Sequence, residues 1–171
     1  MATLPLKPKR GGYLRPFGCG LFIRDFLLGK SPGGSTQIDP LKGAPQSDIC
    51  HEYKIAQLRA IAMDRAIRTE EKAARRGKRY FDPDNITRLA DRYLAGMPYK
   101  TYGCRYSSFI DYLSTIQKLG WVKFTGRQEP SAFQDHYRPG QPRKYFRITR
   151  AGREASDEDW ANPRRALYGK K

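Results

Sequence analysis

Residues 107–122 of the chain read SSFIDYLSTIQKLGWV. Apolar side chains recur here at the spacing of one helix face, at Phe109, Ile110, Leu113, Ile116 and Leu119. Either Ser107 or Ser108 can cap such a helix at its start, and Gly120 ends it. The helical period places the following side chains on the opposite, exposed face: Ser108, Asp111, Tyr112, Thr115 and Lys118. The stretch therefore predicts a helix over residues 107–119.

A β-hairpin is predicted directly after this helix. Residues 121–126 (WVKFTG) read as a strand because apolar and polar side chains alternate, and residues 144–149 (KYFRIT) read as a second strand. The segment between them is long, basic and contains several prolines, which predicts an extended loop at the tip of the hairpin. We expect Trp121 and the Tyr145–Phe146 region to belong to the core, because a buried aromatic at this point would hold the hairpin against the helices.

Two further helices are predicted before residue 107. Residues 82–95 have Asp82 as a cap, Pro83 at the first helical position and a glycine directly after the last apolar position. Residues 49–79 form a longer helical pattern, with an apolar stripe on one side and basic side chains on the other. The basic end of this helix, RRGKR at 75–79, is open to two interpretations, a flank that contacts phosphates or a solvated surface.

The two ends of the chain are predicted to lie outside the main domain. Residues 1–48 form a basic, Pro/Gly-rich N-terminal extension, and residues 157–171 form a basic C-terminal tail after a short helix capped by Thr149. Within the extension, residues 21–28 (LFIRDFLL) are apolar but too few to distinguish a helix from a strand. Residues 1–20 are either a solvated tail or an arm that lies along phosphates. The candidate contacts in that arm are Lys7, Lys9, Arg10 and Arg15.

The charge of the chain favours a polyanionic partner. Among 171 residues, 33 are lysine or arginine and 17 are aspartate or glutamate, which gives a net charge of +16. Such a charge opposes compaction and is tolerated most easily when the usual partner is a polyanion. Aromatic side chains make up 12% and could stack on bases between phosphate contacts. We therefore expect nucleic acid as the partner and no membrane, since no apolar run is long enough to cross one.

Several other classes of protein are disfavoured by the sequence. The three cysteines are an odd number without CxxC spacing, which argues against a disulfide framework and a zinc ribbon and fits a reducing, cytoplasmic compartment. No metal and no cofactor are expected. The chain has no glycine-rich phosphate loop, no HExxH sequence and no paired carboxylates. We therefore expect that the protein is not an enzyme.

Three segments resemble parts of the winged-helix regulators of the PadR-like and MarR-like families. Residues 107–122 resemble the recognition helix and first wing strand, residues 144–155 (KYFRITRAGREA) resemble the second wing strand and the following helix, and residues 85–94 resemble the preceding helix. The resemblance implies a mainly α fold with a small β-hairpin wing (α+β), a winged helix-turn-helix over residues 49–156. One departure is the turn at 97–106, which has ten residues where these families have three or four.

The resemblance also implies a function and a set of contacting residues. It favours a sequence-specific double-stranded DNA-binding protein of the transcriptional regulator type, associated with the nucleoid, either as a homodimer or in a larger assembly. The alternative is a basic RNA-binding subunit of a ribonucleoprotein that uses the winged helix for docking. Arg105 is the candidate for a bidentate guanine contact, since it lies at the start of the recognition helix. The other candidate contacts are Lys100, Tyr106, Ser107, Ser108, Tyr112, Thr115 and Lys118 near that helix, and Arg127, Arg138, Arg143 and Lys144 on the wing.

Overall fold

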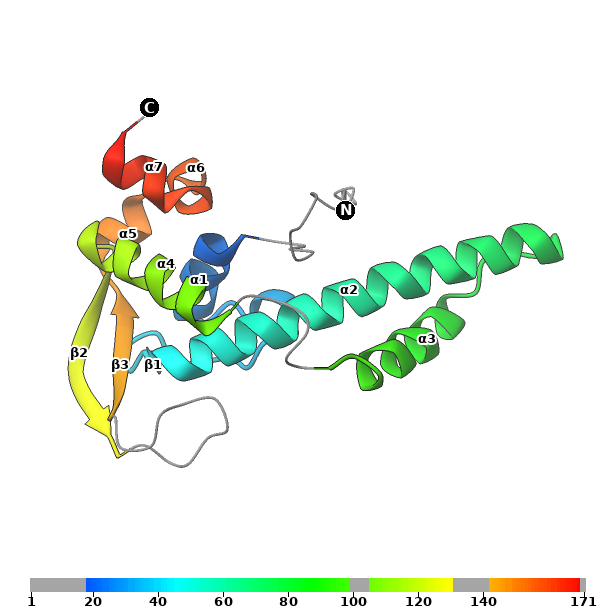
Figure 1. Ribbon diagram of the computed structural model, residues 1–171, viewed down its shortest axis with the longest axis horizontal. Coiled ribbons are helices and arrows are strands. Elements are labelled where there is room, and N and C mark those ends of the chain that lie inside the picture. The colour runs from blue at the N-terminus through cyan, green and yellow to red at the C-terminus, as the bar shows by residue number, and fades with distance from the viewer. Residues whose placement is uncertain (1–17, 99–104, 131–141, 170–171) are drawn as a thin grey trace. The chain divides into compact units, whose positions relative to one another are not determined.

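The computed structural model describes residues 18–98, 105–130 and 142–169 and divides into two compact units. Residues 54–98 belong to the first unit, and the remaining described residues belong to the second. Helix α2 (Gln46–Gly77) begins in the second unit and continues into the first (Figure 1). The described residues are mainly helical with one small antiparallel sheet, as the sequence predicts at this level.

The helices of the second unit come from both ends of the chain. They are α1 (Cys19–Leu27), the 3-10 turn η1 (Pro32–Gly34), α4 (Tyr106–Lys118), α5 (Arg150–Glu154), α6 (Asp157–Ala161) and α7 (Pro163–Tyr168). The apolar segment that the sequence left undecided is thus a helix, and α1 packs against α4, α6 and β3 (Arg143–Ile148). The predicted boundary between extension and domain, at residue 48, falls inside α2.

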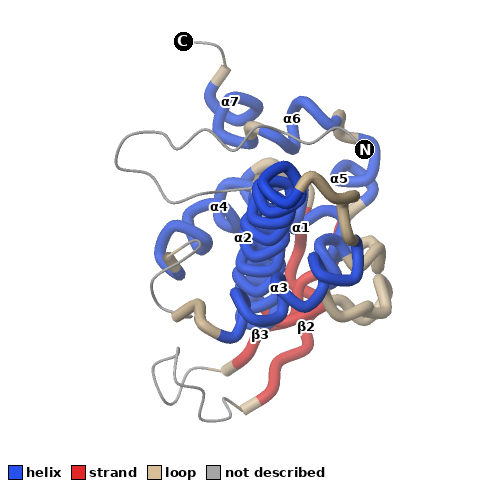
Figure 2. Tube along the Cα trace, turned by 90° about the vertical axis from the view of Figure 1, so that its right-hand side faces the viewer, coloured by secondary structure: helices blue, strands red, loops and turns tan. Residues whose placement is uncertain are grey.

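The sheet of the second unit has three strands in the order β1-β3-β2. β1 (Ala44–Pro45) and β2 (Val122–Glu129) both pair antiparallel with β3, and β2 and β3 run side by side in Figure 2. The β1 strand was not expected from the sequence, because two residues are too few to show alternation. Gly43 lets β1 approach β3: it has φ +71°, and a Cβ there would lie 2.1 Å from the carbonyl oxygen of Phe146.

Two tryptophans pack against each other in the core of the second unit. The rings of Trp121 and Trp160 have centroids 4.8 Å apart, and the indole N–H of Trp160 donates to the carbonyl oxygen of Gly152 at 2.9 Å. Both tryptophans are buried, and so is Phe146. The expectation that Trp121 and Phe146 belong to the core is confirmed, whereas Tyr145 is only half-buried.

The C-terminal segment is folded, which differs from the basic tail that the sequence predicted. Residues 157–168, expected to be part of a basic tail, contain α6 and α7, and Trp160 at 0% exposure lies in the core. The side chain of Ser156 caps α6, and Asp157 forms an ion pair with Arg24 of α1. Helices of five or six residues are too short to show a helical period, which is why the sequence did not reveal them.

The first unit is a helical hairpin made by the distal part of α2 and by α3 (Pro83–Ala95). As predicted, the Asp82 side chain caps α3 by accepting hydrogen bonds from the amides of Asp84 and Asn85. Ala66 of α2 packs in a cluster with Ile86 and Ala90 of α3. None of the helices in the described ranges has the length and apolar composition that would be needed to cross a membrane.

Candidate nucleic-acid interface

Helix α4 begins at Tyr106, earlier than the sequence suggested. Arg105, with an extended backbone, is its N-cap, so neither of the two serines expected to cap the helix does so. An arginine side chain has no hydrogen-bond acceptor, so it cannot satisfy the amides of the first turn as a serine would. Arg105 and Ser107 are exposed at this end, and Ser108 and Tyr112 are half-buried. The start of α4 therefore combines a cation with first-turn amides that its N-cap side chain leaves uncapped.

The exposed face of α4 is narrower than the helical period predicted. Thr115 has an exposed fraction of only 7%, and its hydroxyl donates to the carbonyl oxygen of Asp111 at 2.8 Å. Thr115 is therefore corrected from a nucleic-acid contact to a buried residue. The physical reason is that α1, β2 and α7 all pack against α4, so more than one side of the helix is covered. Lys118, at the last turn, remains exposed.

Tyr106 joins the start of α4 to the start of α2. The side-chain amide of Gln46 donates to the Tyr106 hydroxyl oxygen at 3.1 Å, and both residues are half-buried. This contact, between residues far apart in the sequence, fixes where the first turn of α4 lies within the unit. We assign Tyr106 a positioning role here, although the sequence suggested it as a direct contact.

Arg143 was expected to contact nucleic acid, but it is paired with a carboxylate within the protein. Its guanidinium forms an ion pair with Asp48 of α2 at 2.5 Å, and the arginine side chain is only 20% exposed. Its Nε is buried and has no hydrogen-bond partner among the described residues. The sequence could not show this pair because the partners are 95 positions apart. Arg143 thus connects β3 to α2 and is not available as a solvated phosphate contact.

Arg127 of β2 has two partners within the hairpin. Its guanidinium lies 2.6 Å from Glu129 and over the ring of Tyr145 at 4.3 Å from the centroid. The hydrogen bond from Tyr145, followed by that from Arg127, lowers the pKa of Glu129. Burial, and then the hydrogen bond to Glu129, raises the pKa of Tyr145. Glu129 therefore stays ionised and offsets part of the charge of Arg127.

Two further cations of the hairpin were not among the contacts expected from the sequence. Lys123 of β2 and Arg147 of β3 are paired directly across the sheet, and Lys123 is exposed. The alternation of the two strands was the signal that could have identified them, since Val122 and Ile148, which are buried, point to the other face. Lys144 is also exposed, with its ammonium 5.9 Å from the ring centroid of Phe124. By the same alternation Lys144 lies on the face of Phe146 and Ile148, so the hairpin has cations on both of its faces.

Six of the expected contacts fall outside the described residues. They are Lys7, Lys9, Arg10, Arg15, Lys100 and Arg138. Within the described residues, the candidate interface consists of the start of α4 and the cations of the β2–β3 hairpin, both in the second unit.

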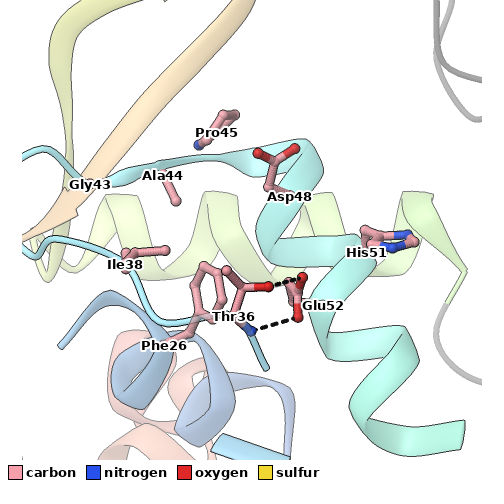
Figure 3. Close-up of a pocket in the computed structure, with 9 residues that line it drawn as sticks. All are labelled: Phe26, Thr36, Ile38, Gly43, Ala44, Pro45, Asp48, His51 and Glu52. Carbon is pink, nitrogen blue, oxygen red and sulfur yellow. Dashed lines mark hydrogen bonds between the residues drawn. The ribbon is translucent and has the colours of Figure 1, made fainter. Parts of the chain in front are cut away.

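A pocket of about 300 Å³ in the second unit is lined by two carboxylates, one histidine and several apolar side chains (Figure 3). The carboxylate of Glu52 accepts hydrogen bonds from the amide and hydroxyl of Thr36 at 3.0 and 2.9 Å. The other carboxylate, Asp48, pairs with Arg143. In the described residues, no group of three or more His, Cys, Asp or Glu side chains could hold a metal ion. Because both carboxylates are already bonded, we assign no ligand to this pocket.

Comparisons of the chain with protein-family models, with curated proteins and with solved structures find no match. The topology and the charged surfaces of the two units are therefore the features from which a function can be inferred.

Proposed function

We propose that the second unit is a winged helix that binds duplex DNA. In a winged helix the chain order is helix, strand, helix, helix, strand, strand, and the short first strand pairs with the last one. The elements α1, β1, the start of α2, α4, β2 and β3 follow this order, and the sheet order is β1-β3-β2. This agreement of chain order with strand order is the observation that carries the proposal.

In this proposal the helices have roles different from those that the resemblance implied. The first helix is α1, the second is the start of α2, and α4 is the recognition helix. The residues of the first unit, 54–104, are then an insertion between the second and third helices of the winged helix. The ten-residue segment 97–106, which departs from the family pattern, returns the chain from this insertion and is not the turn of a helix-turn-helix. The α3 helix belongs to the insertion.

Binding would use the exposed parts of the interface described above. The start of α4, with Arg105 and Ser107 exposed, would enter the major groove, where an arginine can pair with guanine O6 and N7. The hairpin cations Lys123, Lys144 and Arg147 would contact phosphates and supply affinity that does not depend on sequence. A protein built in this way would act as a sequence-specific DNA-binding protein of the transcriptional regulator type.

Selection from a random duplex library with the full-length chain tests this proposal. We expect one family of sequences to be enriched, and the enriched site to bind roughly a thousandfold more tightly than random duplex at the same salt concentration. Structured RNA, measured in parallel, should bind at least about tenfold more weakly than the enriched site. If no sequence is enriched and folded RNA binds more tightly than any duplex, the proposal is wrong.

The second candidate function is an RNA-binding subunit of a ribonucleoprotein. The observation that favours it is the packing of α7 against α4, because the chain's own C-terminal helix then occupies part of the surface of the recognition helix. In that case the winged helix would dock on a partner, and RNA contacts would come from the basic surfaces. The same selection experiment distinguishes the two candidates.

A further inference from the structure

The segment that joins α2 to α3 has a defined backbone conformation. The amide of Arg79 donates to the carbonyl oxygen of Ala74 at 3.1 Å, and the amide of Lys78 donates to that of Arg75 at 3.4 Å. These two bonds are those of a Schellman motif, which ends a helix with one residue in the left-handed conformation. That residue is Lys78, with φ +46°, although a glycine stands one position earlier. A left-handed lysine costs conformational energy that a glycine at the same position would avoid.

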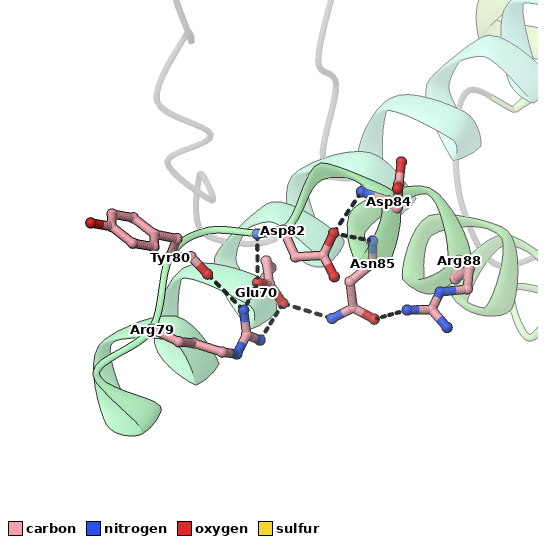
Figure 4. Close-up of polar contacts among 7 residues, drawn as sticks. All are labelled: Glu70, Arg79, Tyr80, Asp82, Asp84, Asn85 and Arg88. Atoms are coloured by element: carbon pink, nitrogen blue, oxygen red, sulfur yellow. Dashed lines mark hydrogen bonds and ion pairs between the residues drawn. The ribbon is translucent and has the colours of Figure 1, made fainter.

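A buried carboxylate holds the loop that follows this motif (Figure 4). Glu70 is 0% exposed and accepts hydrogen bonds from both terminal nitrogens of Arg79, at 2.5 and 3.0 Å. It also accepts from the amide of Asp82 at 3.0 Å and from the side chain of Asn85 at 2.6 Å. The hydrogen bonds from Arg79 and Asn85 lower its pKa to about 2, so the carboxylate is ionised at neutral pH. The loop is thereby tied at both of its ends to the side of α2.

The loop presents aromatic rings to solvent beside unopposed cations. Tyr80 is 96% exposed and Phe81 is 46% exposed, and Figure 4 shows Tyr80 pointing away from the Glu70 network. We call residues 72–81 the hairpin tip; they contain five cations and no acidic residue. Arg79 is neutralised by Glu70, which leaves four exposed cations: Lys72, Arg75, Arg76 and Lys78. The acidic side chains nearest to the tip in sequence are Glu71, which is exposed and directly precedes it, Asp82, which caps α3, and Asp84, which is exposed.

We propose that the hairpin tip is a binding site for single-stranded nucleic acid, in which Tyr80 stacks on a base and the neighbouring cations hold the phosphates. The Tyr80 ring projects into solvent and can offer its face to a base, whereas Phe81 is only about half exposed, so the two rings form no broad apolar patch for a folded protein partner. The cations match a phosphate backbone in charge. The strand is single because the faces of bases inside a duplex are already covered by their neighbours. This inference is carried by the first unit and does not depend on the winged helix proposed for the second.

Fluorescence anisotropy with the full-length chain tests the site. The probes are a labelled oligothymidylate and an abasic oligonucleotide of the same length, which has the phosphates but no bases. For Tyr80→Ala we expect oligothymidylate binding to weaken roughly 5- to 150-fold, the range for the loss of one stacked base, and abasic binding to stay unchanged. Tyr80→Phe keeps the ring and should bind like the wild type. The matched control is Tyr168→Ala, which removes another exposed tyrosine, on α7 of the second unit.

A second variant tests the phosphate contacts. Replacing Arg75 and Arg76 together by serine should weaken binding of both probes, because both have the same phosphate backbone. The inference is overturned if oligothymidylate does not bind, if Tyr80→Ala binds it as tightly as the wild type, or if Tyr80→Ala loses both probes equally. It is also overturned if Tyr80→Ala and Tyr168→Ala have equal effects. The selection from the duplex library depends on α4 and not on Tyr80. If that selection enriches no sequence, but Tyr80→Ala still weakens oligothymidylate binding and leaves abasic binding unchanged, only the winged-helix proposal is refuted.

Discussion

Lys123 on β2 lies directly opposite Arg147 on β3, so that two like charges face each other across the hairpin. Such a pair destabilises a sheet unless an anion lies between or above the side chains. We predict that Lys123→Ala and Arg147→Ala each weaken binding to every duplex alike and reduce the salt dependence of log affinity by about one phosphate contact. Affinities measured over a salt series check this. Arg92→Ala, which removes an exposed cation from α3, is the control and should leave the slope nearly unchanged.

Arg105 at the start of α4 should affect sequence preference. If its guanidinium pairs with a guanine, Arg105→Ala should cost about 1–3 kcal/mol on the selected site and much less on random duplex. The comparison is between binding constants on the two duplexes at one salt concentration. Equal losses on both would mean that Arg105 contacts a phosphate. Arg92→Ala, which removes an exposed cation from α3, serves as the comparison and should change neither binding constant appreciably.

The Trp121–Trp160 pair should dominate the stability of the second unit. Removing either ring leaves a cavity, so Trp121→Ala and Trp160→Ala should each lower the free energy of unfolding by roughly 3–5 kcal/mol. Trp160→Phe keeps most of the volume but leaves the carbonyl oxygen of Gly152 without the indole N–H, and it should cost less. Chemical denaturation measures all three. A truncation before residue 157 should behave like Trp160→Ala, whereas a solvated tail would be removed without effect.

Glu70 should make the first unit sensitive to acid. Its pKa in the folded chain is about 2, below the usual value of 4.5, so its contribution to stability is present above about pH 4.5 and is lost as the pH falls towards 2. Glu70→Gln should therefore lower the thermal midpoint at neutral pH, and the difference from the wild type should shrink in acid. The adjacent Glu71→Gln is the control, because Glu71 is exposed. Parallel pH profiles for the wild type and Glu70→Gln would contradict this prediction.

Some elements were predictable because their signals are local. The α3 helix was predicted within one residue, since Asp82, Pro83 and the glycine after Ala95 mark its ends in the sequence itself. The α4 helix and the two long strands were predicted from hydrophobic periodicity with local end signals such as Gly120, although β2 runs to Glu129, three residues beyond its predicted end. The exact start of α4 was not, because the serines that could cap it lie inside the helix and a bond from Gln46 positions Tyr106 instead. Capping acts within one turn and periodicity within one helix or strand, so a single stretch of chain contains both signals.

The partners of the site residues could not be obtained in this way. Whether Arg143 is a solvated cation depends on Asp48, and whether Thr115 is exposed depends on which helices cover α4. The sequence next to Arg143 or Thr115 contains no signal of either arrangement. Which side chains of α4 are buried depends in part on α7, which packs against it. The α7 helix in turn packs against α6, which contains the buried Trp160.

Composition and local pattern were sufficient for the basic character of the chain, for its mainly helical content and for the hairpin that follows α4. The assembly of α1, β1 and the C-terminal helices into one unit required the folded chain, because the contacts join residues more than a hundred positions apart, such as Arg24 and Asp157. Bringing such distant segments together costs chain entropy, which only the burial of side chains such as Trp160 offsets. Both the entropy cost and the gain from burial are totals over the whole unit, so they cannot be obtained from any single segment of the sequence.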